Sequence, residues 1–497
     1  MNPTYCPVRE THPLRFSSQL LRISLLFLIM MWIGSAASRA DLLPGGQEIV
    51  TIDQNFTGAT ISNSGFIPPD TNGAVGTRTF VELINGNYSV FDKSSHTVLQ
   101  TSSLNQFWTN AGVQTGSSFD PRVVYDRFSA RWYAAAGDNG GSLNSHILIA
   151  VSKTSDPTQG WTGFAISPDS TKQHWADFPT LGINRNGVFV SANMFPLSNG
   201  SLTNTILALP KADLLAPTPT VAHATLFENN NIGNTGFAVQ PAVNLNNGKL
   251  EVLLSGSNFH RSDIMGNIHS PTLTTGPTIP VMNYPFPINA VQPGGVLPLE
   301  ANGNLVASTV IQKSALWGVQ SVLNNGHDAL RWFQIDVKTN KVLQEGLIAK
   351  PGFDYIYGSI AVNKRGDVVI GFTGTSTSQF ASAYAVAGTT VNGRTVFGDP
   401  LLLRQGVSSY ELTFGTGRNR WGDYSATTVD PSHPNSFWTV QEWASGINSW
   451  STQITELTFS VASAPEPSTV FLFISGFAGL AWMQRKSLWR AKVKNVT

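Results

Sequence analysis

The chain has 497 residues, a formal net charge of +1 and a single cysteine, Cys6, which excludes a disulfide framework. Residues 1–40 have a net charge of +3 and residues 465–497 a net charge of +4, so residues 41–464 have a net charge of −6. Residues 41–464 also contain no Lys/Arg cluster, which argues against nucleic acid as a partner. This body is poor in charge and rich in Gly, Asn, Ser and Thr, a composition typical of many strands joined by tight turns.

Residues 1–40 have the layout of a secretory signal peptide. Three arginines precede an apolar run of 11 residues, 23–33, which is too short to span a bilayer as a helix. Ser38 and Ala40 supply the small residues that a signal peptidase needs. The pattern predicts cleavage after Ala40 and therefore export, with an uncleaved anchor as the alternative.

A repeated unit runs through the body. It consists of a polar or small start, a small-apolar strand, an Asn/Asp/Gly turn and a strongly apolar strand. A second strand pair follows most copies, so each copy offers about four strands. Successive copies start 50 to 66 residues apart, at Asp70, Asp120, Asp177, Gln240, Gly294, Tyr357 and Asp423.

This repeat predicts an all-β fold, a β-propeller of seven four-stranded blades, because such units arranged around an axis are propeller blades. The first copy is weak, so six or eight blades remain open. Residues 47–56 are expected to close the ring by pairing with the last blade. The competing architectures are a β-sandwich pair and a solenoid, although spacings near 60 residues are long for a solenoid.

Three motifs resemble those of a broad group of bacterial secreted propellers: PPDTNGAVG from residue 68, DPRVVYD followed by RWY from residue 120, and RWGDYSATTVDP from residue 420. That group is distantly similar to sialidase-like and furanosidase-like propellers. The resemblance covers most of the body, from about Phe66 to Trp443. It implies a fold, but the group carries no single activity.

Four aspartates are the main candidate site residues: Asp70, Asp120, Asp177 and Asp423. They are assigned one repeat position, and Trp175 and Trp421 each precede one of them by two residues. Such a ring could bind a hard cation such as Ca²⁺. It could also seat a sugar against the aromatic rings or supply an acid/base pair. The structural alternative is that these carboxyls accept backbone N–H bonds and fix the loops between blades.

A turn in the second copy carries a structural prediction. The stretch SKTSDPTQGW, residues 152–161, loosely resembles the Asp-box turn of sialidases and the Asp-Pro turn of furanosidases. Those turns are structural in their families. We therefore predict that Asp156 accepts hydrogen bonds within the turn and that Trp161 packs between blades.

The other residues that could act in catalysis or bind a metal do not form a recognisable motif in the sequence. A sialidase needs an arginine cluster and a Tyr–Glu pair, but the arginines are scattered. Glu300 and Glu442 are candidate glycosidase acids, although no spacing selects a pair. Isolated residues, with the histidines predicted to lie on the surface or in loops, are Arg122, Arg185, Arg331, Arg365, Arg420, His146, His174, His260, His269, His327 and His433.

The segment 465–497 resembles the PEP-CTERM sorting signal. Pro465, Glu466 and Pro467 are followed by an apolar stretch, residues 470–483, and by five basic residues, the pattern of a short transmembrane segment with a cytoplasmic positive stop. In that family a membrane enzyme, an exosortase, recognises the triplet and processes the tail. The resemblance implies passage through the inner membrane, with the tail as the only membrane attachment, and then a cell-surface or extracellular-matrix location. A simple C-terminal anchor is the alternative.

Two functions fit these expectations. The first is an exported, non-catalytic module that binds a polysaccharide or a surface protein. The second is a glycoside hydrolase or lyase acting on exopolysaccharide. A pocket with two carboxyls roughly 5–9.5 Å apart would favour the second function.

Overall fold

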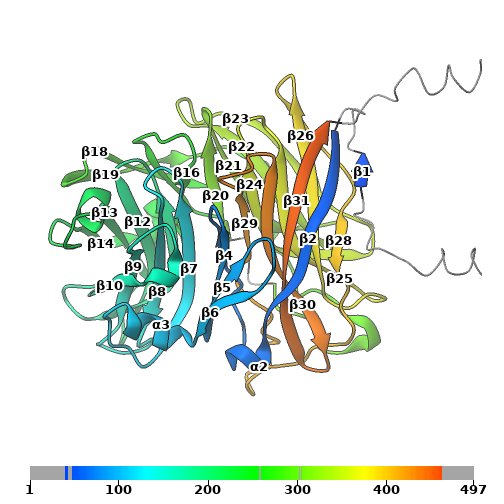
Figure 1. Ribbon diagram of the computed structural model, residues 1–497, viewed down its shortest axis with the longest axis horizontal. Coiled ribbons are helices and arrows are strands. Elements are labelled where there is room, and N and C mark those ends of the chain that lie inside the picture. Colours follow the sequence, from blue (N-terminus) through cyan, green and yellow to red (C-terminus); the bar gives the residue numbers. More distant parts are fainter. Residues whose placement is uncertain (1–39, 43–47, 257–258, 302, 304, 462–497) are drawn as a thin grey trace, which may run out of the picture. The chain divides into compact units, whose positions relative to one another are not determined.

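The computed structural model describes residues 40–42, 48–256, 259–301, 303 and 305–461 (Figure 1). The predicted signal up to Arg39 and the predicted sorting tail lie outside this range. Within it, no helix has the length and apolar character needed to cross a membrane. The helical elements are all short: α2 (Ile61–Ser64), α3 (Leu104–Asn110), α4 (Lys211–Leu214), α5 (Ile232–Thr235) and the 3₁₀ turns η1 (Pro157–Gln159) and η2 (Pro293–Gly295).

Three sheets are four-stranded and antiparallel, with their strands paired in the order of the sequence. The first contains β3 (Gly73–Val75), β4 (Thr79–Ile84), β5 (Asn87–Asp92) and β6 (Val98–Ser102). The second contains β7 (Ser118–Asp126), β8 (Arg131–Asp138), β9 (His146–Ser152) and β10 (Trp161–Ile166). The third contains β15 (Gln240–Pro241), β17 (Glu251–Leu254), β18 (His260–Asn267) and β19 (Ser270–Thr278).

Two sheets are five-stranded. One contains β24 (Phe353–Val362), β25 (Val368–Ser376), β26 (Ser382–Val391) and β27 (Arg394–Phe397), with β28 (Leu401–Arg404) also paired to β26. The other runs in the order β1 (Ala40–Leu42), β2 (Glu48–Thr60), β31 (Ser449–Val461), β30 (Ser436–Gly446) and β29 (Ala426–Val429). It joins the first described strands to the last.

The remaining sheet is a nine-stranded mixed sheet, which differs from the predicted set of separate four-stranded blades. One part is β11 (His174–Ile183), β12 (Gly187–Pro196), β13 (Thr203–Pro210) and β14 (Thr225–Asn231). The other is β20 (Thr309–Gln312), β21 (Ala315–Asn324), β22 (His327–Asp336) and β23 (Val342–Ile348). The two-residue strand β16 (Val243–Asn244) joins the parts, because it pairs in parallel with both β11 and β20.

Ring closure follows the sequence prediction. Strand β2 pairs antiparallel with β31 from Glu48↔Val461 to Thr60↔Ser451, and Figure 1 shows the two strands side by side. The predicted pairing of residues 47–56 with the last unit is therefore confirmed from Glu48 onward. Because β2 forms backbone hydrogen bonds with the side of β31 that faces away from β30, β31 is not an exposed edge strand.

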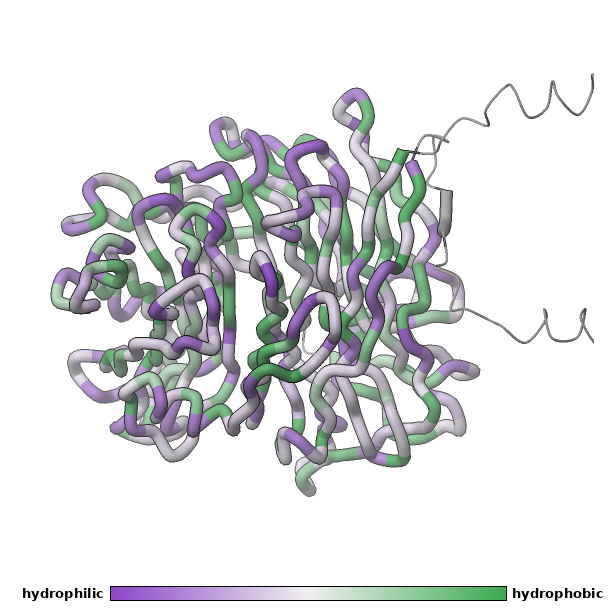
Figure 2. Tube along the Cα trace, viewed as in Figure 1, coloured by the Kyte–Doolittle hydropathy of each residue, from purple (hydrophilic) through white to green (hydrophobic). Residues whose placement is uncertain are grey.

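The apolar core lies between neighbouring sheets. One cluster combines Trp108 and Val81 with Trp132 of β8, and another combines Phe437 and Leu457 with Val369 of β25. A third links Val75 of β3 to Trp438 of β30, so the packing continues from the last sheet back to the first. Figure 2 shows hydrophobic residues along the strands and hydrophilic ones in many of the connecting loops.

A central cavity of about 140 Å³ is lined by the innermost strands of all six sheets. Its lining includes Val75 of β3, Val124 of β7, Leu181 of β11, Gln240 of β15, Ala361 of β24 and Thr427 of β29. Sheets that pack face to face around one axis, with their first strands along it, form a β-propeller. The predicted fold class is therefore correct.

Candidate functional site

Asp70, Asp120, Asp177 and Asp423 come together at one end of the central cavity. Asp70 and Asp423 each lie three residues before the innermost strands β3 and β29, and Asp120 and Asp177 lie near the starts of β7 and β11. The negative charge of Asp70 is close enough to interact with those of Asp120 and Asp423, and Asp177 interacts with Asp120 and Asp423. The structure thus gathers carboxyls from four sheets in one place.

The repeat register is off by one residue at Asp177. Asp70 and Asp120 both adopt the left-handed backbone, with φ of 47° and 51°, a conformation that Asp tolerates better than most residues. In the next unit the left-handed residue is Phe178, with φ of 50°. The assignment of one shared repeat position is therefore wrong for Asp177. A bulge in each strand shifts the pairing locally, and Asp177 still reaches the cluster.

Asn85 holds two of the aspartates in place. Its Nδ2 donates to Oδ2 of Asp70 at 2.7 Å, and its Oδ1 accepts the backbone N–H of Asp120 at 2.8 Å. Asn85 is 6% exposed, so these bonds form away from water. The sequence pattern indicated Asp70 and Asp120 but not Asn85. Asn85 directly follows β4, and its side chain bonds to β7 of the neighbouring sheet.

Two arginines that are distant in sequence meet at the cluster. Arg420 places Nη2 2.9 Å from Oδ1 of Asp423 and Nη1 3.6 Å from Oε2 of Glu300. The guanidinium of Arg122 lies 3.2 Å from the ring centre of Tyr424, and its Nε donates to the carbonyl of Pro179. Arg331 and Arg365 instead pair elsewhere, with Glu345 and Asp367.

Both candidate glutamates also reach this region. Glu300 bonds to Arg418 and lies beside Arg420. Glu442 is 4% exposed and is close enough to Asp70 for the two carboxylates to repel each other. With the four aspartates, six carboxyls therefore lie in this region together with Arg122 and Arg420, while Arg418 binds Glu300 from the surface. The site holds more acidic than basic groups.

Burial and mutual repulsion raise the pKa of all four aspartates. Loss of solvation is the largest cause, and the neighbouring carboxylates add to it. The pKa of Asp120 rises to about 7 and that of Asp177 to about 6. Burial also raises the pKa of Glu442 well above its ordinary value. At neutral pH the cluster therefore favours a bound proton or a cation.

Three oxygens of the cluster receive no hydrogen bond from any donor within the described residues: Asp70 Oδ1, Glu300 Oε2 and Glu442 Oε1. The carboxyl of Asp120 is within hydrogen-bonding reach of that of Asp70, but this contact requires a proton shared between them. Asp177 is also close to the backbone N–H of Phe178, which lowers its pKa. The structural alternative of backbone N–H bonds therefore accounts for only part of the cluster.

Trp421 does not line the cluster as the sugar-stacking hypothesis requires, whereas Trp175 is only half-buried. Trp421 is 1% exposed, packs edge-on against Tyr410 at 4.9 Å and donates from Nε1 to Thr373. Trp175 packs against Phe195, at 5.5 Å between ring centres, and against Phe119. The ring of Trp421 is enclosed by the core, so it cannot present a face to a ligand.

The predicted turn behaves as a structural element. Oδ1 of Asp156 accepts the N–H and the hydroxyl of Thr158, at 3.0 and 2.7 Å. Trp161 packs against Phe107 and Tyr88 in the core between the first two sheets. Both predictions for this turn are confirmed.

The prediction that His269 lies on the surface or in a loop is confirmed, because its side chain is 45% exposed in the turn between β18 and β19. His269 is isolated in the sequence, but the fold places it beside Asp213 and His223, with the possible ligand atoms of all three within 4.8 Å of one another. His146, His174 and His327 each pair with a single aspartate instead: Asp138, Asp169 and Asp354 respectively.

Comparison with known proteins gives a likeness in fold only. No family model matches the chain, and no curated protein matches it. Among solved structures, a sialidase of Trypanosoma rangeli is 8% identical with a TM-score of 0.35, over 78% of this chain and 58% of that one. The chain thus spans less than two thirds of that sialidase's length.

Two further solved structures show the same level of similarity. The hemagglutinin-neuraminidase of parainfluenza virus 5 is 11% identical with a TM-score of 0.38, over 72% of this chain and 94% of that one. The protein YjhT is 10% identical with a TM-score of 0.38, over 68% of this chain and 99% of that one. At these values the likeness says nothing about activity.

Proposed function

We propose that this protein is an exported β-propeller that binds an extracellular ligand, a polysaccharide in the first place, at the acidic end of its central channel. The observation that carries the proposal is the convergence of Asp70, Asp120, Asp177 and Asp423 from four sheets. Burying four carboxyls together costs free energy unless a bound partner compensates their negative charge. The cluster therefore favours a ligand or an ion at this place.

Calcium is the compensating partner that fits best. Ca²⁺ takes six to eight oxygen ligands, mainly carboxylates and carbonyls. Asp70 Oδ1 and Glu442 Oε1 are buried oxygens without a donor, and the cluster carries excess negative charge. A bound Ca²⁺ would restore the balance and could also coordinate sugar hydroxyls from the solvent side. A surface protein that offers a basic side chain is the alternative partner.

A glycoside hydrolase or lyase is the second candidate function. It is favoured by one observation: carboxyls with different environments lie together, and the pKa of Asp120 is raised to about 7. A group with such a pKa is suited to hold a proton at neutral pH and act as a general acid. Glu300, which bonds to Arg418 and lies beside Arg420, would then be the second carboxyl of the catalytic pair.

The blade count is best interpreted as seven. The parts β11–β14 and β20–β23 of the mixed sheet are each four-stranded and antiparallel. Separate apolar clusters join the third sheet, which starts at β15, to each of these parts. Only the two-residue strand β16 links the parts, so we count them as two blades that flank the β15 sheet.

The proposed location rests on the sequence of the two ends. The signal pattern of residues 1–40 supports export, and the Pro465-Glu466-Pro467 triplet supports processing by an exosortase. Mass spectrometry of the protein from its native membrane and matrix fractions tests this. Mature termini near Asp41 and residue 464 would support the proposal, and an intact C-terminus in the matrix would contradict it.

The function is tested by screening the protein against a panel of polysaccharides, in calcium and in chelator. Binding is followed by affinity electrophoresis, and cleavage by the release of reducing sugar. We expect calcium-dependent binding without cleavage. Asp70→Asn should weaken it, because the amide keeps the shape and tolerates the left-handed backbone but loses the charge. Asp53→Asn, on the exposed face of β2, is the matched control.

The outcomes separate the two functions. Release of reducing sugar that Asp120→Asn and Glu300→Gln each abolish would establish the enzyme. Binding that is equal in calcium and chelator and is insensitive to Asp70→Asn would place the ligand elsewhere on the propeller.

A further inference from the structure

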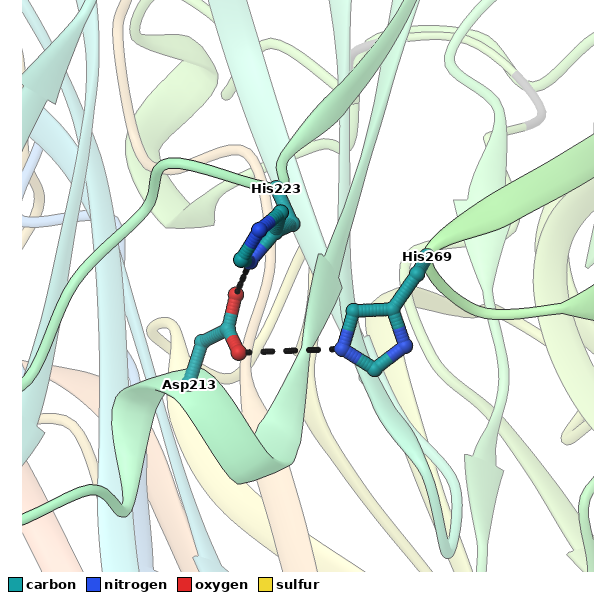
Figure 3. Close-up of side chains that lie close together, drawn as sticks. All are labelled: Asp213, His223 and His269. Atoms are coloured by element: carbon teal, nitrogen blue, oxygen red, sulfur yellow. Dashed lines mark hydrogen bonds and ion pairs between the residues drawn. The ribbon is translucent and has the colours of Figure 1, made fainter.

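Asp213, His223 and His269 form a compact group far from the acidic channel end in sequence (Figure 3). Asp213 belongs to the single-turn helix α4, and His223 lies in the loop between α4 and β14 of the mixed sheet. His269 lies in the turn between β18 and β19, which belongs to a different sheet. Figure 3 shows both imidazole rings next to the carboxylate of Asp213.

The distances within the group suit a shared ion. His223 Nδ1 is 2.9 Å from Oδ2 of Asp213, and His269 Nε2 is 3.7 Å from Oδ1. The two rings are 5.4 Å apart between centres and inclined at 71°. In a tetrahedral site with ligands about 2.0–2.1 Å from the ion, ligand atoms are about 3.4 Å apart. Shifts of about 1 Å therefore close the site.

Neighbouring groups prepare two of the three ligands. Oδ1 of Asn267 accepts the backbone N–H of His269 at 3.1 Å and lies 3.4 Å from Nδ1 of its ring. A proton on Nδ1 directed at Asn267 leaves the lone pair of Nε2 facing Asp213. Metal-binding histidines are commonly oriented in this way, by a hydrogen-bond acceptor on the ring nitrogen that does not bind the metal. The carbonyl of Asp213 accepts the N–H of Thr220, which folds the loop toward His223.

The charge balance also suits a cation. Lys211, only two residues from Asp213, is buried and directs its ammonium to Asp126 and to the carbonyl of Asn184. It therefore does not neutralise Asp213. The side chain of Asp213 is 13% exposed, whereas those of His223 and His269 are 61% and 45% exposed, so the two rings can adjust at low cost.

We propose that Asp213, His223 and His269 bind a divalent transition-metal ion of the zinc type. Two imidazoles and one carboxylate are borderline ligands that suit Zn²⁺, Ni²⁺ or Cu²⁺ better than Ca²⁺ or Mg²⁺. Three protein ligands leave a fourth position open for water or for a donor from a partner. Because its ligands come from two sheets, the ion ties α4 and its loop to the β18–β19 turn.

The test uses the full chain without a polyhistidine tag, stripped with a chelator and titrated with ZnCl₂ by calorimetry at pH 7.5. We expect one ion bound through these residues and a higher melting temperature in Zn²⁺, because binding to the folded state alone stabilises it. His223→Gln and His269→Gln should each lower the affinity at least about 100-fold, and Asn267→Ala about 10-fold.

His433→Gln is the matched control, because His433 is also exposed and lies 3.8 Å from an aspartate, Asp430, but is not part of the three-residue group. It should leave Zn²⁺ affinity and the zinc-dependent rise in melting temperature unchanged. The proposal is overturned if no saturable Zn²⁺ binding occurs. It is also overturned if the double variant His223→Gln/His269→Gln binds Zn²⁺ as tightly as the wild type, which would place the ion at the acidic channel end.

Discussion

Replacing Asp120 by Asn should stabilise the metal-free protein at pH 8. Loss of solvation on burial, together with the charges of Asp177 and Asp423, raises the pKa of Asp120 to about 7 from an ordinary 3.8. Between these values the unfolded chain releases a proton that the folded chain keeps, so the stability of the wild type falls as the pH rises through this window. Above about pH 7 the folded protein bears the full cost of the buried charge. Asparagine removes that cost.

The size of the gain follows from the pKa. The difference between about 7 and 3.8, at about 1.4 kcal/mol for each pH unit, corresponds to an upper limit of about 4 kcal/mol. Unfolding a body of about 420 residues releases roughly 0.9 kcal/mol per kelvin of entropy, so this limit corresponds to about 4–5 °C in melting temperature. Asp70 and Asp177 share the repulsion, and the measured gain should therefore be smaller than the limit.

Calorimetric scans at one heating rate, in chelator, at pH 4, 6 and 8, measure this effect. The variant should melt higher than the wild type at pH 8, and the difference should shrink toward pH 4, where the wild-type carboxyl is protonated in the folded chain and about half protonated in the unfolded chain. Asp53→Asn, at an exposed position, should show no such trend. A variant that melts lower than the wild type by the same amount at all three pH values would refute the reasoning and leave Asp120 a structural acceptor.

Asp177→Asn should lower the melting temperature in calcium if a cation neutralises the cluster, but in chelator at neutral pH it should cause no loss and a small gain, because the buried charge is then uncompensated; equal losses in both conditions would indicate backbone bonds instead. Trp421→Ala should cost about 3–5 kcal/mol in urea unfolding because the ring is fully buried, whereas weaker ligand binding at unchanged stability would contradict the packing role. Val50→Asp should make the β2 strand sensitive to proteolysis, since Val50 is fully buried where the ring closes, and a wild-type digestion pattern would argue against that closure. A chain of residues 41–464 should be soluble with one cooperative melt, because β2 and β31 both lie within it; aggregation without a melt would show that the ends contribute to folding.

Local patterns were enough to predict the class of fold. Alternating apolar residues and Asn/Gly turns specify strands from neighbours in the chain, and the recurrence of the unit predicted a propeller closed by residues near Glu48. The acidic starts of the units also predicted that Asp70, Asp120, Asp177 and Asp423 would meet, because innermost strands run in one direction along the axis. The turn roles of Asp156 and Trp161 followed from the same local reasoning.

Only the tertiary structure decided the features that depend on contacts between units. The parallel pairing of β16 merges two units into one sheet, and the bulges of β7 and β11 align Asp120 with Phe178, so Asp177 stands one position out of the repeat register. Arg122 and Arg420 are almost 300 residues apart in sequence, yet both meet the carboxyls. Asp213 and His269 come together only because two sheets pack side by side. Strand periodicity reports which face of a strand is buried, whereas the partner across that face is set by how the ring closes.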